Sequence, residues 1–398
     1  MADAPTPPDN SAPHRLSKPL IVLLLLVFLK QLGNGMVWSV IAIYGQSMGA
    51  SAAVIGLMIS AYGGARLLVN VPAGFASERF GRRRMMSLGC AVAALSAFAV
   101  VMSSQIGAFF GCLLLMGIGS AFFITSALAA VVDLGVPGRR LQDMSLYQGA
   151  NMIGASMGPA LGGLTAGLWG YDAPFFINGI IAVCGIVAFA VMPWPETQQR
   201  AERVRPAPGQ LRQLARQGIG VGLMYFSIFY VRTASNWILM PLIAQTKFQL
   251  DLATIGLILT SGAVANLSVL TITHRLANRF GRVRLIVLSS ILTLIGCASL
   301  AFGEGTASLW FSSILFGFGG GIATPTLTAY VADVAPVGQR GPAMGLLRTM
   351  QDLALILGPF FTGLLVDHLG LGFQGGLFGC LALLGAATIA FRWGARGL

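Results

Sequence analysis

Long apolar runs divide the chain into twelve segments, each near the length that a helix needs to cross a membrane. An α-helix rises 1.5 Å per residue, so about 20 apolar residues cross about 30 Å of hydrocarbon. The runs are too long and too continuously apolar for barrel strands, and lipid offers no partner to an open backbone, so we predict helices. The runs cover residues 19–44, 52–76, 85–104, 107–132, 144–168, 173–193, 218–243, 252–274, 284–302, 307–332, 344–366 and 374–393.

One long polar stretch interrupts this pattern and separates six runs from six. Its prolines disfavour a continuous helix, so we interpret it as a linker. The pattern therefore predicts an all-α membrane protein of two six-helix bundles. The expected parts are a disordered cytoplasmic tail (1–17), an N-terminal bundle (18–193), a cytoplasmic linker (194–217) and a C-terminal bundle (218–398).

Composition supports a membrane protein. Apolar residues make up 56% of the chain and charged residues 10%, against about one quarter in soluble domains. The net charge of +12 would suggest a nucleic-acid partner in a soluble protein. With Met1 in the cytoplasm, however, every Lys and Arg outside the runs except Lys247 falls on the cytoplasmic side. The positive-inside rule thus predicts that both termini are cytoplasmic, and we expect no nucleic-acid partner.

A basic, glycine-centred turn occurs twice. The segment ERFGRRRMM at 78–86 recurs as NRFGRVRLI at 278–286. The same register continues along both halves and predicts a duplicated unit, and an even number of spans per half makes the two repeats parallel. The matched pairs include Gly56 with Gly256, Gly81 with Gly281, Asp133 with Asp333, Arg140 with Arg340, Gly158 with Gly358 and Pro159 with Pro359.

The first copy of the turn resembles the loop signature GxLaDrxGrr that the major facilitator superfamily carries after its second helix. Here it extends from Gly74 to Arg83, with Glu78 in place of the usual Asp. The resemblance covers the chain apart from its tail and linker. It implies a twelve-helix transporter whose halves rock around a central site, an alternating-access mechanism.

The resemblance also implies that the first turn latches the halves through Glu78 and Arg82. An acid and arginines around a glycine turn can pair with a neighbouring helix end. The alternative is that the arginines only mark topology. We favour both roles for the first copy and topology alone for the second, because Asn278 replaces the acid there.

Two further aspartates, Asp133 and Asp333, lie at the inner ends of the fourth and tenth runs. We expect them to pair with Arg140 and Arg340. Together with residues of the turns and of a glycine segment described next, they form the expected gating set: Gly74, Glu78, Arg79, Gly81, Arg82, Asp133, Arg140, Gly158, Pro159, Gly281, Arg282, Asp333 and Arg340.

The glycine segment GASMGPALGG, residues 154–163, matches the tail of the GxxxGPxxGG signature that the family carries in the fifth helix of its exporters. The resemblance implies antiport-type efflux, whereas the alternative is ordinary packing of small residues. One feature departs from the family. Its drug and proton antiporters carry an arginine in the fourth helix, in the pattern lxxRxxqG, and this chain has Leu113 there.

Four cations lie well inside the runs, where each costs about 2.5 to 3.5 kcal/mol on insertion scales. Such residues usually face protein or water, and polar residues three or four positions away share their sides of the helices. We therefore expect one polar chamber for a small-molecule substrate. Its expected residues are Lys30, Asn34, Arg66, Asn70, Gln148, Asn151, Tyr230, Arg232, Asn236, Asn266, Arg348 and Gln351.

Asp352 is the one acid near mid-membrane in the sequence, and we expect it to exchange protons. Four cations against one anion favour a negatively charged ligand, since guanidinium pairs well with carboxylate or phosphate. In the alternative, Arg348 pairs with Asp352 in its own helix, Lys30 is neutral, and a remaining arginine binds backbone carbonyls.

These observations predict a monomeric secondary transporter in the plasma membrane, the inner membrane of a bacterium. We expect it to export a small anionic or amphipathic organic compound in exchange for protons, surrounded by membrane lipid. Without a phosphate-binding loop, a metal cluster or a nucleophile with its base in the sequence, we expect no enzyme activity and no cofactor. The alternatives are an importer or facilitator of small organic anions, a receptor without transport, or a lipid-modifying enzyme.

Overall fold

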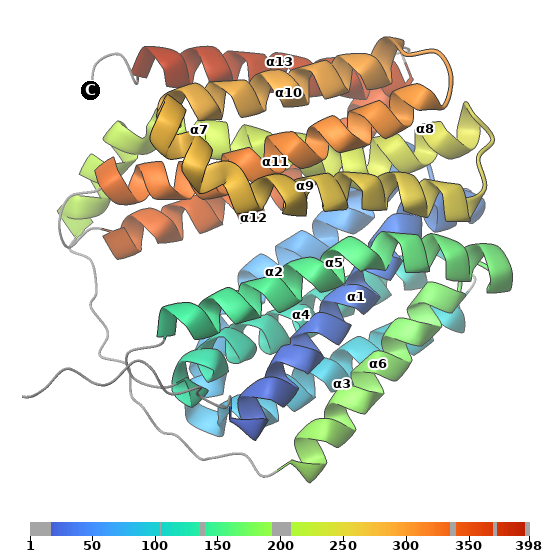
Figure 1. Ribbon diagram of the computed structural model, residues 1–398. Coiled ribbons are helices and arrows are strands. Elements are labelled where there is room, and N and C mark those ends of the chain that lie inside the picture. The colour runs from blue at the N-terminus through green and yellow to red at the C-terminus, as the bar shows by residue number, and fades with distance from the viewer. Residues whose placement is uncertain are drawn as a thin grey trace, which may run out of the picture.

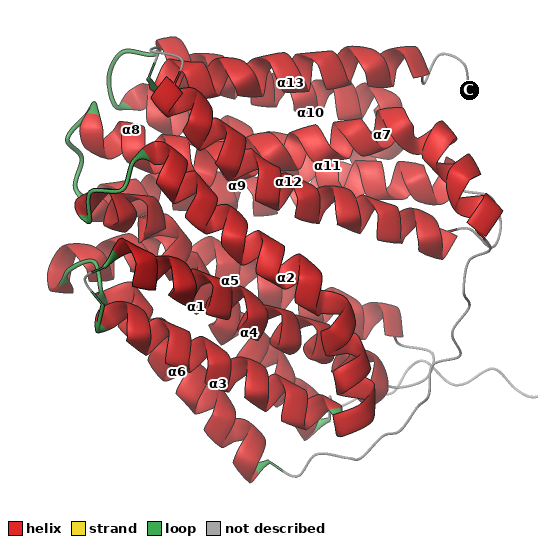
Figure 2. Ribbon diagram, turned by 180° about the vertical axis from the view of Figure 1, so that it is seen from behind, coloured by secondary structure: helices red, strands yellow, loops and turns green. Residues whose placement is uncertain are grey.

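The computed structural model describes residues 17–103, 105–135, 140–192, 208–334, 340–368 and 372–394, and within them the chain is helical apart from short turns (Figures 1 and 2). The helices of the first half are α1 (Lys18–Ser47), α2 (Ala52–Phe80), α3 (Arg82–Val101), α4 (Ile106–Leu134), α5 (Arg140–Trp169) and α6 (Ala173–Val191).

The second half has a matching set of spans. They are formed by α7 (Pro208–Ala234) with the π-helix η1 (Ser235–Leu239) and α8 (Met240–Thr246), then α9 (Leu252–Phe280), α10 (Arg282–Phe302), α11 (Ala307–Val334), α12 (Arg340–His368) and α13 (Phe373–Gly394). Because α7, η1 and α8 follow one another without a break, they make one span, and the expected twelve-helix fold is confirmed. Residues 208–217, expected as linker, are helical, and Pro208 occupies the first turn, where proline is tolerated.

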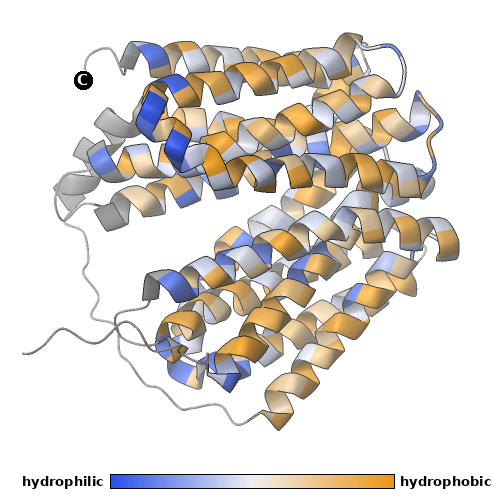
Figure 3. Ribbon diagram, in the orientation of Figure 1, coloured by the Kyte–Doolittle hydropathy of each residue, from blue (hydrophilic) through white to orange (hydrophobic). Residues whose placement is uncertain are grey.

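Membrane-spanning character follows from length and surface. Ten of the described helices are long and apolar enough to cross a membrane. Large apolar side chains point outward, among them Leu68, Leu95 and Ile389. Hydrophobic residues run along the helices, and hydrophilic ones gather near their ends and in the loops (Figure 3). A lipid environment accounts for this outward apolar surface, which water would not.

Glycine ends the second helix of each half. Gly81 and Gly281 have φ angles of 93° and 82°, a region that side chains with a Cβ avoid. The repeated basic turn of the sequence is therefore a helix stop, directly followed by the next helix. At the other end of α2 and α9, Ser51 and Asp251 cap the first turn through their side-chain oxygens. The bonds from Thr254 lower the pKa of Asp251.

The two bundles meet along two seams, α2 against α12 and α5 against α9. A Cβ on Gly56 would overlap the backbone carbonyl of Pro359, and a Cβ on Gly256 would overlap that of Pro159. These two contacts are related by the repeat of the sequence, so the seams are equivalent. In both seams glycine lets the two backbones approach each other closely.

The seams lie toward one end of the molecule. We call the end where α1 begins and α13 ends the terminus end, and the opposite one the far end. The glycine contacts occur toward the far end, and there Asp367 of α12 also accepts a 2.8 Å hydrogen bond from the backbone N–H of Ala53 in α2. Toward the terminus end the bundles diverge (Figure 1).

We expect Gly56→Ala to destabilise the protein by about 2 kcal/mol, because backbone cannot move aside as a flexible side chain can. The unfolding midpoint in detergent measures this. Gly64→Ala in the same helix is the matched control, since a Cβ there meets nothing within 4 Å. Equal midpoints for the two variants would contradict the close backbone contact.

Candidate functional site

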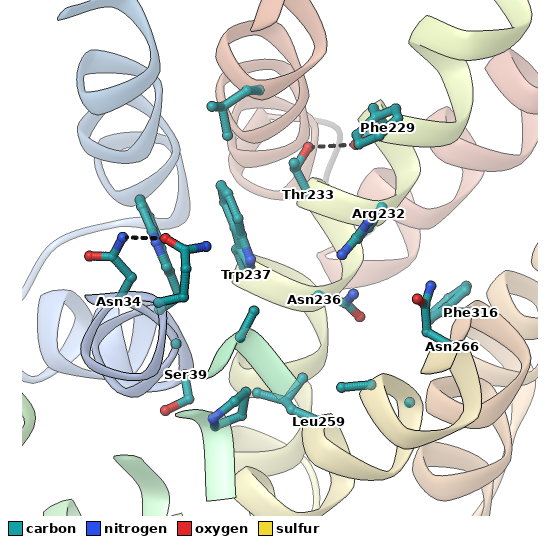
Figure 4. Close-up of a pocket in the computed structure, with 18 of the residues that line it drawn as sticks. Asn34, Ser39, Phe229, Arg232, Thr233, Asn236, Trp237, Leu259, Asn266 and Phe316 are labelled. Atoms are coloured by element: carbon teal, nitrogen blue, oxygen red, sulfur yellow. Dashed lines mark hydrogen bonds between the residues drawn. The ribbon is translucent and has the colours of Figure 1, made fainter. Parts of the chain in front are cut away.

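A cavity of about 320 Å³ lies between the two bundles. Helices of both halves line it, and its wall combines aromatic rings with amide, hydroxyl and guanidinium groups (Figure 4). The aromatic lining is Trp38, Tyr62, Phe229, Trp237 and Phe316; the polar lining includes Gln31, Asn34, Ser39, Arg66, Asn151, Arg232, Thr233, Asn236, Asn266, Ser313 and Gln351.

The structure brings together more than half of the residues expected in the chamber. Those that line the cavity are Asn34, Arg66, Asn151, Arg232, Asn236, Asn266 and Gln351. They come from α1, α2, α5, α7, η1, α9 and α12, which lie far apart in the sequence. For Asn34, Asn236 and Gln351 the signal was a polar residue three or four positions from a cation within a span.

Five other expected residues are not part of this lining: Lys30, Asn70, Gln148, Tyr230 and Arg348. Lys30 is buried and bonded to Asn34. Tyr230 is also buried, and its hydroxyl accepts from Thr362 at 3.4 Å. Of the four cations expected around the chamber, Arg66 and Arg232 line this cavity.

Arg66 is neutralised across the interface between the bundles. Its guanidinium on α2 forms an ion pair with Asp352 on α12. The Arg66 side chain is 12% exposed and that of Asp352 is 4% exposed, so both charges are largely removed from solvent. Arg348, one turn before Asp352, lies 4.0 Å from the same carboxylate and its side chain is 54% exposed. Asp352 thus stands between arginines of opposite bundles.

Arg232 differs from Arg66 because no carboxylate of the described residues lies within 4.0 Å of it. Its exposed surface belongs to the cavity, which it lines together with Asn236 and Asn266 (Figure 4). The guanidinium carbon lies 5.9 Å from the ring centre of Phe229, a cation–π arrangement. Arg232 therefore presents a positive charge to the cavity without a protein anion beside it.

Two tryptophans from opposite bundles meet in the cavity wall. The rings of Trp38 on α1 and Trp237 in η1 stack with centroids 4.2 Å apart and planes 11° apart, and Tyr62 meets Trp38 edge-on. The sequence analysis omitted Trp38. Its signal was available, because Asn34 and Trp38 share one side of α1 at a spacing of four.

The two basic turns each contain an ion pair within their own bundle. Arg82 at the start of α3 donates to Asp133 at the end of α4, at 3.1 Å, and to Ser77 at 3.2 Å. Arg282 pairs with Asp333 in the same way, and it also donates to the carbonyl of Ala329 at 2.7 Å. The second turn, for which topology alone was expected, has this contact as well.

Other expected gating residues have simpler surroundings. The side chains of Arg140 and Arg340 lie outside the described residues, so their expected pairing with Asp133 and Asp333 is not described. Gly74 faces open space apart from Thr125, and Arg79 lies over the ring of Phe80 at 5.3 Å. Glu78 is exposed at the end of α2.

The glycine segment of α5 has two faces with different partners. Gly158 packs against Gly35 of α1 within the N-terminal bundle. Pro159 and Gly163 contact Gly256 of α9 across the interface. The same short stretch thus holds α5 to its own bundle and to the other one.

Comparison with known proteins agrees with this architecture. The sequence model of the Major Facilitator Superfamily matches residues 23–231 and 221–396. The chain belongs to the major facilitator superfamily. It is a multi-pass membrane transporter of this family, and its homologues and fold are those of transporters.

The chain is similar to bacterial resistance proteins over most of its length. Multidrug resistance protein 2 of Bacillus subtilis is 28% identical over 362 residues, 87% of this chain and 88% of that protein. Quinolone resistance protein NorA of Staphylococcus aureus is 19% identical over 357 residues, 88% and 91% of the two chains. The solved structure of nucleoside transporter NupG has a TM-score of 0.80 at 14% identity, covering 96% of this chain and 99% of its own.

We expect Asp352→Asn to cost about 3 kcal/mol of unfolding free energy, because it leaves the largely buried Arg66 without its counter-charge. Arg348→Gln, the matched change on the exposed partner, should cost less than about 1 kcal/mol. Thermal unfolding of the purified protein compares them. Similar losses for both variants would contradict a pairing centred on Arg66.

Proposed function

We propose that this transporter exports a small anionic or amphipathic organic compound in exchange for protons. The observation that carries the proposal is Arg232, a cation in an aromatic-lined cavity between the bundles, with no carboxylate of the described residues within 4.0 Å. An unpaired charge inside a membrane protein is costly, and a bound anion would offset that cost. The substrate site comprises the seven lining residues that the sequence analysis also selected.

The chemistry of the lining supports an aromatic or amphipathic anion. Guanidinium binds carboxylate or phosphate oxygens through two parallel N–H groups. The side-chain amides of Asn236 and Asn266 stand beside Arg232, while Trp38, Trp237 and Phe316 offer apolar faces. The cavity wall can therefore bind a charged group through Arg232 and an aromatic ring through these apolar faces.

Asp352 is the proton-coupling residue in this proposal. It joins the bundles through Arg66, and protonation would remove the negative charge that holds that pair together. The equivalent positions in the other seam, by the repeat of the sequence, are Met152 and Asn266, which cannot form such a pair. Proton binding would thus loosen one seam and leave the other unchanged, so the bundles could rock.

Alternating access follows from the two ends of the molecule. The far end is closed by the glycine seams and by Asp367 capping α2. We place the termini in the cytoplasm of a bacterium on the positive-inside pattern, so this state opens inward. The turns at Gly81 and Gly281, braced by Arg82–Asp133 and Arg282–Asp333, would close the inner end in the opposite state.

Export rather than import rests on two supports. The glycine segment 154–163 matches the exporter signature, and relatives are named multidrug and quinolone resistance proteins. In this proposal the transporter is a monomer within lipid, with one bundle formed by α1–α6 and the other by α7–α13.

Inverted membrane vesicles test the proposal. With an imposed gradient, acidic inside, 2-naphthoate should dissipate the pH difference and accumulate inside the vesicles. Vesicles without the protein are the control. Accumulation only in right-side-out vesicles would point to an importer, and conversion of the compound without accumulation would point to an enzyme.

We expect Asp352→Asn to abolish substrate-dependent proton movement while exchange of labelled against unlabelled 2-naphthoate continues. The amide keeps the shape of the carboxylate but cannot exchange a proton at this site. Proton flux is followed with a pH-sensitive dye and exchange with the label. Proton movement at the wild-type rate would remove Asp352 from the mechanism.

We expect Arg232→Gln to weaken 2-naphthoate binding by about 10-fold to 100-fold, the value of a charge-assisted hydrogen bond. Titration calorimetry measures the dissociation constant. Arg348→Gln is the matched control, because that guanidinium lies off the cavity lining. An unchanged dissociation constant of 2-naphthoate for Arg232→Gln would show that Arg232 does not form the anion site.

A further inference from the structure

Lys30 is a buried cation that does not touch the cavity, and the proposed function leaves it unused. The residue is 3% exposed. No carboxylate of the described residues lies within 4.0 Å of its ammonium group, which donates to Asn34 Oδ1 at 3.1 Å. A charge of this cost in the middle of a span calls for a role beyond packing.

The bond from Lys30 is the first of a chain that reaches the cavity. Asn34 Nδ2 donates to Gln31 Oε1 at 3.2 Å. Gln31 Nε2 then donates to Asn151 Oδ1 at 3.3 Å and so connects α1 with α5. Asn34, Gln31 and Asn151 all line the cavity (the Asn34 bond is drawn in Figure 4).

This series of hydrogen bonds runs in one direction, from donor to acceptor, and Lys30 sets that direction. An amide can turn either its oxygen or its nitrogen to a neighbour, but an ammonium has three donors and no acceptor. Asn34 must therefore turn its oxygen to Lys30, which leaves its nitrogen to donate onward. The same constraint passes to Gln31 and then to Asn151, so each amide oxygen is occupied within the chain.

As a consequence, the cavity presents hydrogen-bond donors to a ligand. The last amide, Asn151, accepts through its oxygen and keeps its N–H groups for the cavity. Arg232, which also lines this cavity, can only donate. A ligand between them meets N–H groups from both bundles and must supply acceptor oxygens to match them.

We propose that Lys30 is a positioning residue for substrate specificity. It fixes the orientation of three cavity amides so that the last of them, Asn151, presents its N–H groups to the ligand, which selects compounds that carry acceptors, carboxylates above all. The inference rests on the proposed function and deepens it. Lys30 acts on the ligand through Asn34, Gln31 and Asn151, not by contact.

The test uses two probes of equal size and opposite hydrogen-bonding character, 2-naphthoate and 2-naphthylmethylammonium. Calorimetry on the purified full-length protein gives both dissociation constants, and the selectivity is their ratio. We expect the wild type to prefer the carboxylate. Lys30→Met frees the amides to turn, so it should weaken 2-naphthoate binding about tenfold and leave the binding of the ammonium probe unchanged or tighter.

Lys18→Met is the matched control, because it removes a charge from the exposed start of the same helix and should leave the ratio unchanged. A double-mutant cycle distinguishes an effect transmitted through the hydrogen-bonded amides from a long-range effect of the lost positive charge. In an Asn151→Ala background, Lys30→Met should change the ratio much less. If Lys30→Met changes the ratio as much in this background as in the wild type, Lys30 does not act through the amides. Should Lys30→Met fail to fold, Lys30→Gln replaces it, since glutamine also lacks a fixed donor direction.

Each remaining outcome is decisive. If Lys30→Met leaves the ratio unchanged, including by an equal loss of affinity for both probes, the proposed role of Lys30 is wrong. This holds even where the wild type still transports 2-naphthoate. If the wild type neither binds 2-naphthoate nor couples it to proton movement, the proposed function fails and this inference fails with it.

Discussion

Close contact between backbones across the two seams is the constraint on which the rest of the structure depends. Gly56 and Gly256 each face a proline carbonyl of the opposite bundle, with no room for a side chain. Since lipid provides no hydrophobic drive for helices to associate, tight packing must hold the bundles together. In the α2–α12 seam Arg66 also meets Asp352, and Arg66 lines the cavity.

Three of the four cations inside the spans have a polar or charged protein partner. Arg66 has its carboxylate, Arg348 reaches the same carboxylate from an exposed position, and Lys30 donates a hydrogen bond to Asn34 in its own helix. Arg232 alone among these four faces the cavity without a counter-charge in the described residues. The equivalent halves of the fold thus have different tasks, a charged contact in one seam and a neutral one in the other.

The sequence was sufficient for the fold because its signals were of the kind that lipid enforces. Apolar length, the repeat at Gly81 and Gly281, and the basic loops all follow from the membrane as solvent. Cavity residues such as Asn151 and Asn266 could be found because helical periodicity puts polar neighbours on one side of a span.

Pairing could not be read from the sequence, since it depends on how helices are rotated against one another. Lys30 and Arg66 look alike in sequence, yet Lys30 bonds within α1 whereas Arg66 pairs across the bundles. Asp133 pairs with Arg82, which lies 51 positions before it, because the start of α3 lies against the end of α4. Trp38 was missed because an aromatic residue in a span usually faces lipid or core.

The π-helix within the seventh span sets the angular relation between Arg232 and Trp237. In a regular α-helix, positions five apart point about 140° away from each other, so a cation and an indole at this separation would face different neighbours. The wider turn at Ser235–Leu239 reduces that angle, and both side chains reach the same space. A regular α-helix over the same residues would therefore rotate half of the span and separate the charged part of the pocket from its aromatic part, although no lining residue would be changed.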